Sequence, residues 1–589
     1  MTTRQEPSGI FAHLLVLAVL LAAGAGIYYP SLKAGPVFDD LHTLEQNPAL
    51  RTLSLKKIFS DPSAFSQKPG NWPYRPMTVL SYALDWQLGA GSFAVFHITN
   101  LLLHGLAAFL IYLAAILLFQ NRRAGIIAAL LFLAHPLPGF SVNYLSARSG
   151  MLSCLFMLSS LVCWLKWDGR EPGQKLPWLI ASLGFFILAL LSKTDALSFI
   201  FVLGCLLLFS ARDNEENLLG LWLKWFPHKI PPPLRGGEQG EGELKKPHQS
   251  PSPLKGEGEN SSRFWQQPFL SWWHFVVLGV CFSVVYKLVS GSLLGAVREN
   301  MIPVHSRGAS ILAGISAPWI YFFKLLFPSH LTLFPALPEP RWLLLLLSLA
   351  GYVMTIVLVA RYRTLKLWLP LVWYFGAILP LTLLRLNILL AWHRGYISLS
   401  GLFIGAGLLA DFALRKRRAS GMALLGLVLV LLGAVSNFQA RAWQDPVRLW
   451  TEAVAYAPGE FVPHHFLGTL LINRGAPAQA ERELLTALQL NPEFVDARNS
   501  LGALYFQERE LFQARDQFEE CVRLDPENYI YLENLLIVRQ KLLQIGGMDR
   551  MVERLLQIAP ADDPKLLQII DRYEELRAAA EGKNFAPEK

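Results

Sequence analysis

The sequence has little charge and few cysteines for its length. Of its 589 residues, 16% are Asp, Glu, Lys or Arg, whereas soluble domains carry about 25%. Its five cysteines have spacings that indicate neither a disulfide framework nor a zinc site. An ordinary soluble domain and a disulfide-stabilised secreted domain are therefore both excluded.

Long apolar runs take the place of charge, since 53% of the residues are hydrophobic. About 20 apolar residues span a bilayer as a helix, so we expect an all-α membrane bundle of about eleven spans. These lie at 10–29, 93–119, 124–140, 148–166, 177–192, 196–210, 268–290, 342–360, 367–384, 396–414 and 420–436. The stretch 310–328 contains Pro318, Lys324 and Pro328, and we expect it to be re-entrant or to lie on the membrane surface.

Basic clusters indicate the orientation of the spans. Arg122–Arg123, Arg361–Arg363 and Arg415–Arg418 fall in alternate loops, and Lys and Arg are enriched in cytoplasmic loops. We therefore expect a cytoplasmic N-terminus and an exoplasmic C-terminal region. The same rule accounts for the net charge of +9 without a nucleic-acid partner.

One loop differs from the rest of the chain in composition. Residues 231–262 are rich in Pro, Gly, Glu and Lys and repeat a short low-complexity unit. A segment with so few apolar residues cannot bury a core of its own. We therefore expect 231–262 to be a disordered cytoplasmic loop.

The last quarter of the chain contains an internal repeat. A proline recurs every 34 residues, at Pro458, Pro492, Pro526 and Pro560. At the same period, Gly468 and Ala480 are followed by Gly502 and Ala514. Such a helix–turn–helix period is typical of tetratricopeptide (TPR) repeats. We expect a transmembrane domain at 1–438 and a TPR α-solenoid at 439–589, closed by a polar capping helix at 563–581.

The loops expected on the exoplasmic side contain the unusual polar residues. Asp39–Asp40 follow the first apolar run, and cations lie at Arg148, Lys193, Arg307 and Arg394. Such a set suits transfer from a lipid-linked phosphate, because a carboxylate can take the proton of an attacking hydroxyl while cations stabilise the leaving phosphate. One carboxylate is then enough, whereas glycoside hydrolysis normally needs two.

Motifs in the first 200 residues resemble those of a known family. They are Phe38-Asp39-Asp40; Tyr74-Arg75-Pro76 with Ser81, Tyr82 and Asp85; Phe96-His97 with Asn100 and His104; His135-Pro136 through Arg148; and Ser192-Lys193. The family is the transmembrane and TPR-repeat-containing O-mannosyltransferases, with their bacterial relatives, in the glycosyltransferase C (GT-C) superfamily. The resemblance covers most of the chain, including the C-terminal repeats.

The resemblance implies an inverting membrane glycosyltransferase. It would move a sugar from a polyprenyl phosphate to an acceptor hydroxyl, that of a protein or peptide held by the repeats, on the exoplasmic face of a bacterial inner membrane. The implied catalytic residues are Asp39 and Asp40; the implied phosphate-binding residues are Arg75, Arg148, Lys193, Arg307 and Arg394; the implied pocket residues are Tyr74, His135 and His393. No cofactor is certain, and a divalent cation on the Asp pair is left open.

The chain departs from the family pattern at acidic positions. Phe140 and Gly150 replace a Glu and an Asp, and Ser192-Lys193-Thr194-Asp195 stands where Ser-Lys-Glu is usual. These losses leave a second hypothesis open, a non-catalytic membrane scaffold whose repeats assemble cell-surface machinery. For Arg75 the alternative to phosphate binding is a structural ion pair with Asp85.

Overall fold

The protein is built from helices. The computed structural model describes residues 8–66, 73–169, 172–213, 257–290, 307–361, 365–382, 390–415, 418–544, 546–559 and 564–580. Within these ranges there are α-helices, short 3-10 helices and a π-helical turn, and no β-strand. The predicted all-α class is confirmed.

The chain forms two compact units. The first comprises Met1–Ser329 and Pro338–Arg441, and the second comprises His330–Leu337 and Ala442–Lys589. The place of His330–Leu337 in the second unit was not predicted from the sequence. The His330 ring lies 4.5 Å from the Tyr456 ring of that unit, centre to centre, and Leu333, Phe334 and Leu337 are buried.

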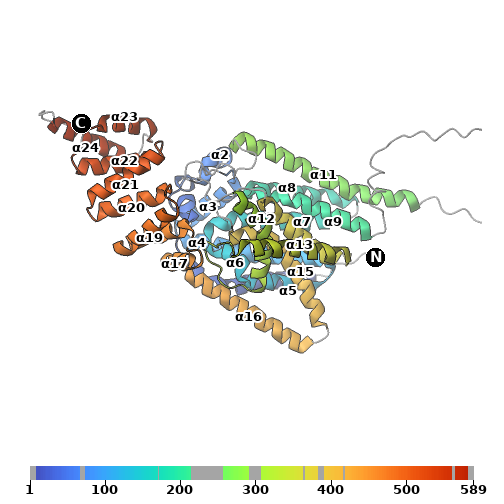
Figure 1. Cartoon of the computed structure of the whole chain (residues 1–589). Helices are drawn as coiled ribbons and strands as arrows, with labels where there is room; N and C mark the ends of the chain where they lie inside the picture. The colour runs from blue at the N-terminus through green and yellow to red at the C-terminus, as the bar shows by residue number, and fades with distance from the viewer. Residues whose placement is uncertain are drawn as a thin grey trace, which may run out of the picture. The chain divides into compact units, whose positions relative to one another are not determined.

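The first unit is a bundle of long helices joined by short helical turns (Figure 1). Its α-helices are α1 (Ser8–Tyr28), α2 (Leu55–Ser60), α3 (Pro76–Gly89), α4 (Phe93–Phe119), α5 (Arg122–Ala134), α6 (Pro136–Asn143), α7 (Arg148–Asp168), α8 (Lys175–Ser192), α9 (Ser198–Asp213), α11 (Glu257–Ser290), α12 (Arg307–Leu326), α13 (Arg341–Arg361), α14 (Leu365–Thr382), α15 (Tyr396–Leu414) and α16 (Arg418–Ala442). The short helices are η1 (Tyr29–Lys33), η2 (Leu41–Glu45), η3 (Pro48–Leu50), η4 (Pro62–Phe65), η5 (Leu145–Ala147), η6 (Pro172–Gln174), η7 (Thr194–Leu197) and η8 (Trp392–Gly395).

The bundle makes the chain a multi-pass membrane protein. Among the described residues, nine helices are long and apolar enough to cross a bilayer, or ten if α5 and α6, bent by 53° at His135, form one span. The stretch predicted to be re-entrant is part of α12, which passes the same test of length and composition. The described apolar parts of α9 and α14 are shorter than a span, so the predicted count of eleven stays a prediction.

Two contacts show that α1 and α16 end at the same end of the bundle. Asn437, near the end of α16, donates to the carbonyl oxygen of Ile27, near the end of α1, at 2.8 Å. Ser436 donates to the carbonyl oxygen of Ala134, at the end of α5, at 2.7 Å. Because α1 and α16 end together, an odd number of crossings lies between the start of α1 and the end of α16.

The second unit is a row of helix pairs (Figure 1). They are α17 (Pro446–Tyr456), α18 (Phe461–Asn473), α19 (Pro477–Leu490), α20 (Val495–Gln507), α21 (Leu511–Leu524), α22 (Tyr529–Lys541), α23 (Met548–Ile558) and α24 (Pro564–Ala580). Successive first helices begin at Phe461, Val495 and Tyr529, which is the predicted 34-residue period. A Cβ at Gly468 or Gly502 would lie 2.7 Å from the side chain of the partner helix, so the period places small residues where helices cross.

The predicted disordered loop is in part outside the described residues. Of 231–262, residues 231–256 lie outside the description, and 257–262 form the start of α11. For those six residues the prediction of disorder is wrong. α11 continues from them into an apolar span at Ser271–Ser290, and helix propagation into a polar flank adds one hydrogen bond for each residue fixed.

Candidate active site

The carboxylate pair lies in a tight turn after the first span. Phe38, directly before the pair, has a φ of 58°, a left-handed conformation that costs a non-glycine residue about 1–2 kcal/mol. The π-helical turn η2 begins at Leu41, directly after Asp40. Strained conformations of this kind persist only where surrounding contacts hold them, and they cluster at functional sites.

Asp40 is the buried member of the pair. Its Oδ1 accepts hydrogen bonds from the backbone N–H and the hydroxyl of Ser146 at 2.7 and 2.5 Å, and its Oδ2 accepts one from Val37 N–H at 3.1 Å. The residue is 1% exposed. Its carboxyl group is therefore occupied by protein donors, and it ties the loop to η5.

Asp39 is the accessible member, with a side chain that is 41% exposed. Its Oδ2 accepts a hydrogen bond from the Tyr144 hydroxyl at 2.6 Å, and its Oδ1 lies 3.3 Å from Nε2 of His42. The other ring nitrogen of His42 lies 2.9 Å from the Ser66 hydroxyl. Two protein groups thus fix the Asp39 carboxylate while leaving part of it open to an incoming group.

Because their burial and their hydrogen-bond partners differ, the two carboxyl groups differ in acidity. Burial raises the pKa of Asp40 to about 7, and the charge of Asp39 adds to the rise, although the bonds from Ser146 and Val37 lower it. Burial also raises the pKa of Asp39, but His42, the Tyr144 hydrogen bond and the charge of His393 together hold it below its ordinary value. At neutral pH Asp39 is ionised, whereas Asp40 is divided between its protonated and its ionised form.

Three of the predicted phosphate-binding cations converge near this pair. Arg75 precedes α3, Lys193 follows α8, and Arg394 lies in η8. The charges of Arg75 and Arg394 both act on Lys193, and all three act on His393, which also interacts with Asp39. Segments that are far apart in the sequence therefore meet around His393.

The cluster has an excess of positive charge. The Nζ of Lys193 lies 2.5 Å from Oδ2 of Asp195. With Asp39 and Asp195 ionised, three cations face two carboxylates, and Asp40, whose pKa is about 7, adds a third negative charge only in part at neutral pH. Confined sites of one sign raise the local concentration of ligands of the opposite sign. The arrangement suits an anion.

Neighbouring groups hold this cluster in place. The guanidinium of Arg75 stacks 5.0 Å from the centre of the Phe65 ring and donates to the Ser149 hydroxyl at 3.3 Å. A Cβ added to Gly150 would lie 3.9 Å from the carbonyl oxygen of His393, with nothing closer. Position 150 thus borders the cluster, and the glycine there adds no negative charge to it.

Arg148 is placed differently from its prediction as a phosphate-binding residue. Its side chain is 0% exposed, and Nη1 lies 2.5 Å from Oδ2 of Asp85. Nε donates to Asn100 Oδ1 and Nη2 to the Phe96 carbonyl oxygen, each at 2.7 Å. Because protein groups engage its donors, Arg148 has a structural role. The alternative considered for Arg75 was an ion pair with Asp85, and it is Arg148 that forms this pair.

Two of the remaining predicted residues, Tyr74 and His135, support the fold around the cluster. Tyr74 donates its hydroxyl to the Phe59 carbonyl oxygen at 2.8 Å and is 6% exposed. His135 caps α6 by accepting from Leu137 N–H at 3.1 Å, and its Nε2 lies 2.9 Å from the Leu325 carbonyl oxygen. Arg307 begins α12, and its side chain lies outside the description. Of the predicted pocket residues, His393 is the one found in the cluster.

The Asp pair does not offer the protein ligand set of a calcium ion. Protein donors occupy both oxygens of Asp40, and a hydroxyl and an imidazole contact those of Asp39. In the part of the chain that the structure describes, no group of three His, Cys, Asp or Glu could hold a metal ion. Calcium takes six to eight oxygen ligands, which this arrangement does not offer.

Tyr144, Ser146 and His42, which distinguish the two carboxylates, were not predicted from the sequence. Tyr144 and Ser146 lie in the loop that precedes Arg148, a segment already marked by the family motif. Their hydrogen bonds to Asp39 and Asp40 join positions more than 100 residues apart in sequence. No rule of sequence spacing predicts such a pairing. The sequence could therefore indicate that this loop matters, but not which of its residues bind the carboxylates.

Comparison with known proteins confirms the resemblance noted in the sequence. No family model matches the chain. The chain is 29% identical to the protein O-mannosyl-transferase TMTC3 of Mus musculus over 177 residues, which are 29% of this chain and 19% of that protein. It is 32% identical to TMTC1 of Mus musculus over 215 residues, which are 34% of this chain and 23% of that protein. It is 28% identical to Tmtc1 of Drosophila melanogaster over 226 residues, which are 36% of this chain and 26% of that protein.

The match spans about a fifth to a quarter of the length of these relatives. Among solved structures, the Archaeoglobus fulgidus oligosaccharyltransferase aligns with 82% of this chain and 59% of its own at 14% identity, with a TM-score of 0.39. A likeness at that score supports no conclusion on function. What the relatives do is therefore a basis for a proposal only.

Proposed function

We propose that this protein is a membrane glycosyltransferase that moves a sugar from a polyprenyl phosphate to a hydroxyl group of a protein on the exoplasmic face. One observation carries the proposal: the exposed carboxylate of Asp39 and the cations Arg75, Lys193 and Arg394 act on the same residue, His393. A base for the acceptor thus lies beside a positively charged place for the donor. The names of the relatives support the sugar transfer.

The chemistry follows from these positions. The acceptor oxygen attacks the anomeric carbon and forms the new C–O bond, while Asp39 takes the hydroxyl proton. The bond between that carbon and the phosphate oxygen breaks, and its electron pair stays on the lipid phosphate. Arg75, Lys193 and Arg394 stabilise the phosphate charge that grows as the bond breaks. A single displacement opposite the leaving group inverts the anomeric carbon.

The repeats supply a place for a protein acceptor. Stacked helix pairs form extended concave surfaces that bind other chains, and α17–α24 form such a stack. α16, which leads into them, ends at the same end of the bundle as α1, where the Asp39 loop follows. Both observations support acceptor capture on the membrane side where the reaction takes place, which we propose is the exoplasmic side.

The direct test is sugar release by the purified protein. Full-length protein in detergent is incubated with a panel of polyprenyl-phosphate sugars and acceptor peptides, and the sugar-free lipid phosphate and the glycosylated peptide are quantified. We expect both products to form in equal amounts with at least one donor, and neither to form with Asp39→Asn. Absence of both products across the panel with the wild-type protein contradicts the proposed function.

Removing one cation of the cluster is expected to impair donor use. Charge-assisted hydrogen bonds contribute about 1.5–3 kcal/mol, so Arg394→Gln should lower kcat/KM for the donor by roughly 10- to 150-fold. Arg341→Gln is the matched control, because Arg341 is 55% exposed and pairs with Glu339 outside the cluster. Equal kcat/KM values for Arg394→Gln and the wild type would remove Arg394 from the site.

The pH profile identifies the base. A base must be ionised, so activity is lost as the pH falls through its pKa. The ordinary pKa of an aspartate is about 4. The pKa of Asp39 lies below that ordinary value, whereas the pKa of Asp40 is about 7. We expect kcat/KM to change less than about threefold between pH 8 and 5. A tenfold loss per pH unit below pH 7 would assign the base to Asp40 instead.

A further inference from the structure

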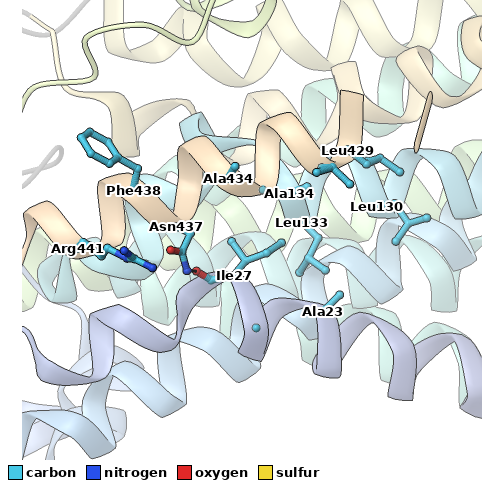
Figure 2. A pocket seen from close by; sticks show the side chains of 13 residues that line it. Ala23, Ile27, Leu130, Leu133, Ala134, Leu429, Ala434, Asn437, Phe438 and Arg441 are labelled. Carbon is cyan, nitrogen blue, oxygen red and sulfur yellow. Dashed lines mark hydrogen bonds between the residues drawn. The ribbon is translucent and has the colours of Figure 1, made fainter. Parts of the chain in front are cut away.

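A groove opens between three helices on the outside of the bundle. It has a volume of about 630 Å³ and lies between α1, α5 and α16 (Figure 2). Its lining is almost entirely apolar and includes Ile27, Leu133, Val430 and Phe438. The groove is separate from the carboxylate and cation cluster described above.

The groove exists because α16 packs loosely against its neighbours. Near its C-terminal end α16 is tied to α5 and α1 by the bonds of Ser436 and Asn437. Small residues on the facing surfaces leave the space open: a Cβ added to Gly26 would meet nothing within 4 Å, and one added to Gly433 would only touch Ile27 at 3.5 Å. Nothing in these three helices fills the volume.

One end of the groove is charged. Arg441, in the last turn of α16, is the one ionisable residue of the lining. It is exposed, and no carboxylate of the described residues forms an ion pair with it. Figure 2 shows Arg441 and Asn437 at one end, while Ala23 and Leu130 lie toward the other. This is the end at which α1 leads into the Asp39 loop.

The length of the groove matches one leaflet. The lining on α16 runs from Leu429 to Arg441, and twelve steps of an α-helix cover about 18 Å. The hydrocarbon core of a bilayer is about 30 Å thick, so one leaflet contributes about half of that. A chain held along the groove with its head group at Arg441 would stay within one leaflet.

We propose that this groove binds an anionic phospholipid of the bilayer. An acyl chain lies along Ile27, Leu133 and Val430, and the phosphate contacts Arg441. Apolar packing alone does not distinguish lipids within a membrane, because lipid tails are as apolar as the helices. The selectivity comes from the charge, and a basic residue near the membrane surface contributes about 1 kcal/mol toward anionic lipid.

A polyprenyl phosphate is the alternative occupant, and two features argue against it. Its chain is longer than one leaflet is deep. Behind Leu133, which lines the groove, the Tyr28 hydroxyl donates to the Leu133 carbonyl oxygen at 3.0 Å, and His104 Nε2 approaches the same oxygen at 3.3 Å. These side chains are 0% exposed, and they close the groove on its inner side. The proposal therefore does not depend on the proposed sugar transfer.

The test is photolabelling of the full-length protein in vesicles. Phosphatidylglycerol or phosphatidylcholine with a diazirine on the acyl chain is irradiated, and the labelled peptides are mapped by mass spectrometry. We expect phosphatidylglycerol to label the α1 and α16 residues of the groove at least fivefold more than phosphatidylcholine does. Arg441→Gln should abolish this difference, while Arg441→Lys should retain it.

Matched variants test the groove itself. Gly26→Leu fills it, whereas Gly426→Leu adds the same side chain to α16 at a position that also has no atom within 4 Å of a Cβ but does not line the groove. We expect the first to reduce labelling at least fivefold and the second to leave it unchanged. Equal labelling of the wild type and Arg441→Gln would overturn the proposal. The proposal would also be overturned if polyprenyl phosphate displaced the probe and an equal mole fraction of unlabelled phosphatidylglycerol did not.

Discussion

Asp39→Asn is expected to lower kcat for sugar transfer by two to four orders of magnitude, because general-base catalysis contributes about that much. An amide cannot take the proton of the acceptor hydroxyl. Asp39 is the carboxylate that is 41% exposed and lies in electrostatic range of His393. The measurement is the initial rate of release of lipid phosphate, with donor and acceptor above their KM values.

The variant is informative because Asn fits the local hydrogen bonds. Its amide oxygen can accept from the Tyr144 hydroxyl, and its amide nitrogen can donate to Nε2 of His42. At Asp40 the same substitution places an NH₂ group against a protein donor, either Val37 N–H or Ser146 N–H. We therefore expect Asp39→Asn to unfold at the wild-type temperature, and Asp40→Asn to unfold at a lower one.

A different result would favour the scaffold hypothesis. If Asp39→Asn and the wild type released lipid phosphate at the same rate, Asp39 would not be the base. A second possible result is that neither the wild type nor Asp39→Asn releases lipid phosphate, while changes in the repeats abolish assembly of a cell-surface complex. The bundle would then serve as an anchor. The lost acidic positions Phe140 and Gly150 would then be signs of a degenerate site.

Arg148→Met is expected to destabilise the bundle by about 3–5 kcal/mol, the usual cost of removing one partner of a buried ion pair. It leaves the Asp85 carboxylate, which is 5% exposed, without its cation. It also removes the hydrogen bonds to Asn100 and Phe96 and the stacking on the Tyr82 ring at 4.7 Å. The measurement is thermal unfolding in detergent, followed by tryptophan fluorescence.

Two further variants separate a structural role for Arg148 from phosphate binding. Arg148→Met with Asp85→Leu removes both charges, and replacing a buried pair by apolar groups is often neutral, so we expect most of the lost stability to return. Arg75→Met should keep the wild-type unfolding temperature and lose transfer, because Arg75 lies in the cation cluster. A wild-type unfolding temperature for Arg148→Met, together with a raised KM for the donor, would restore Arg148 to the phosphate site.

Local patterns in the sequence were enough for the architecture. The 34-residue period was predicted, because each repeat must bury the same face against its neighbour, and it reappears in helices that begin at Phe461, Val495 and Tyr529. Apolar length predicted most of the spans, since a bilayer admits only helices whose backbone bonds are satisfied internally. Most of the stretch 310–328, with Pro318 and Lys324, lies in α12, which is long and apolar enough to cross a bilayer; its re-entrant or surface position stays a prediction.

Residue types and the family motifs predicted the kind of chemistry at the site. They did not predict the roles of the individual residues. Asp39 and Asp40 are adjacent in sequence and chemically identical, and only Tyr144, Ser146 and Val37 make one accessible and the other buried. Arg75 and Arg148 looked equivalent as cations near an exoplasmic loop. Asp85 and Asn100 turn the second into a buried ion pair.

The amino-acid sequence by itself determined the helical class, the membrane setting, the repeat period and the loops that carry the polar residues, because each of these follows from a local pattern. Only the tertiary structure decided which carboxylate is exposed, which cations converge on His393, and that a groove ending at Arg441 lies between α1, α5 and α16. These properties depend on burial and on distances between segments far apart in the chain. The free energy of a charge is set by its surroundings, and those surroundings come from residues that no local pattern connects.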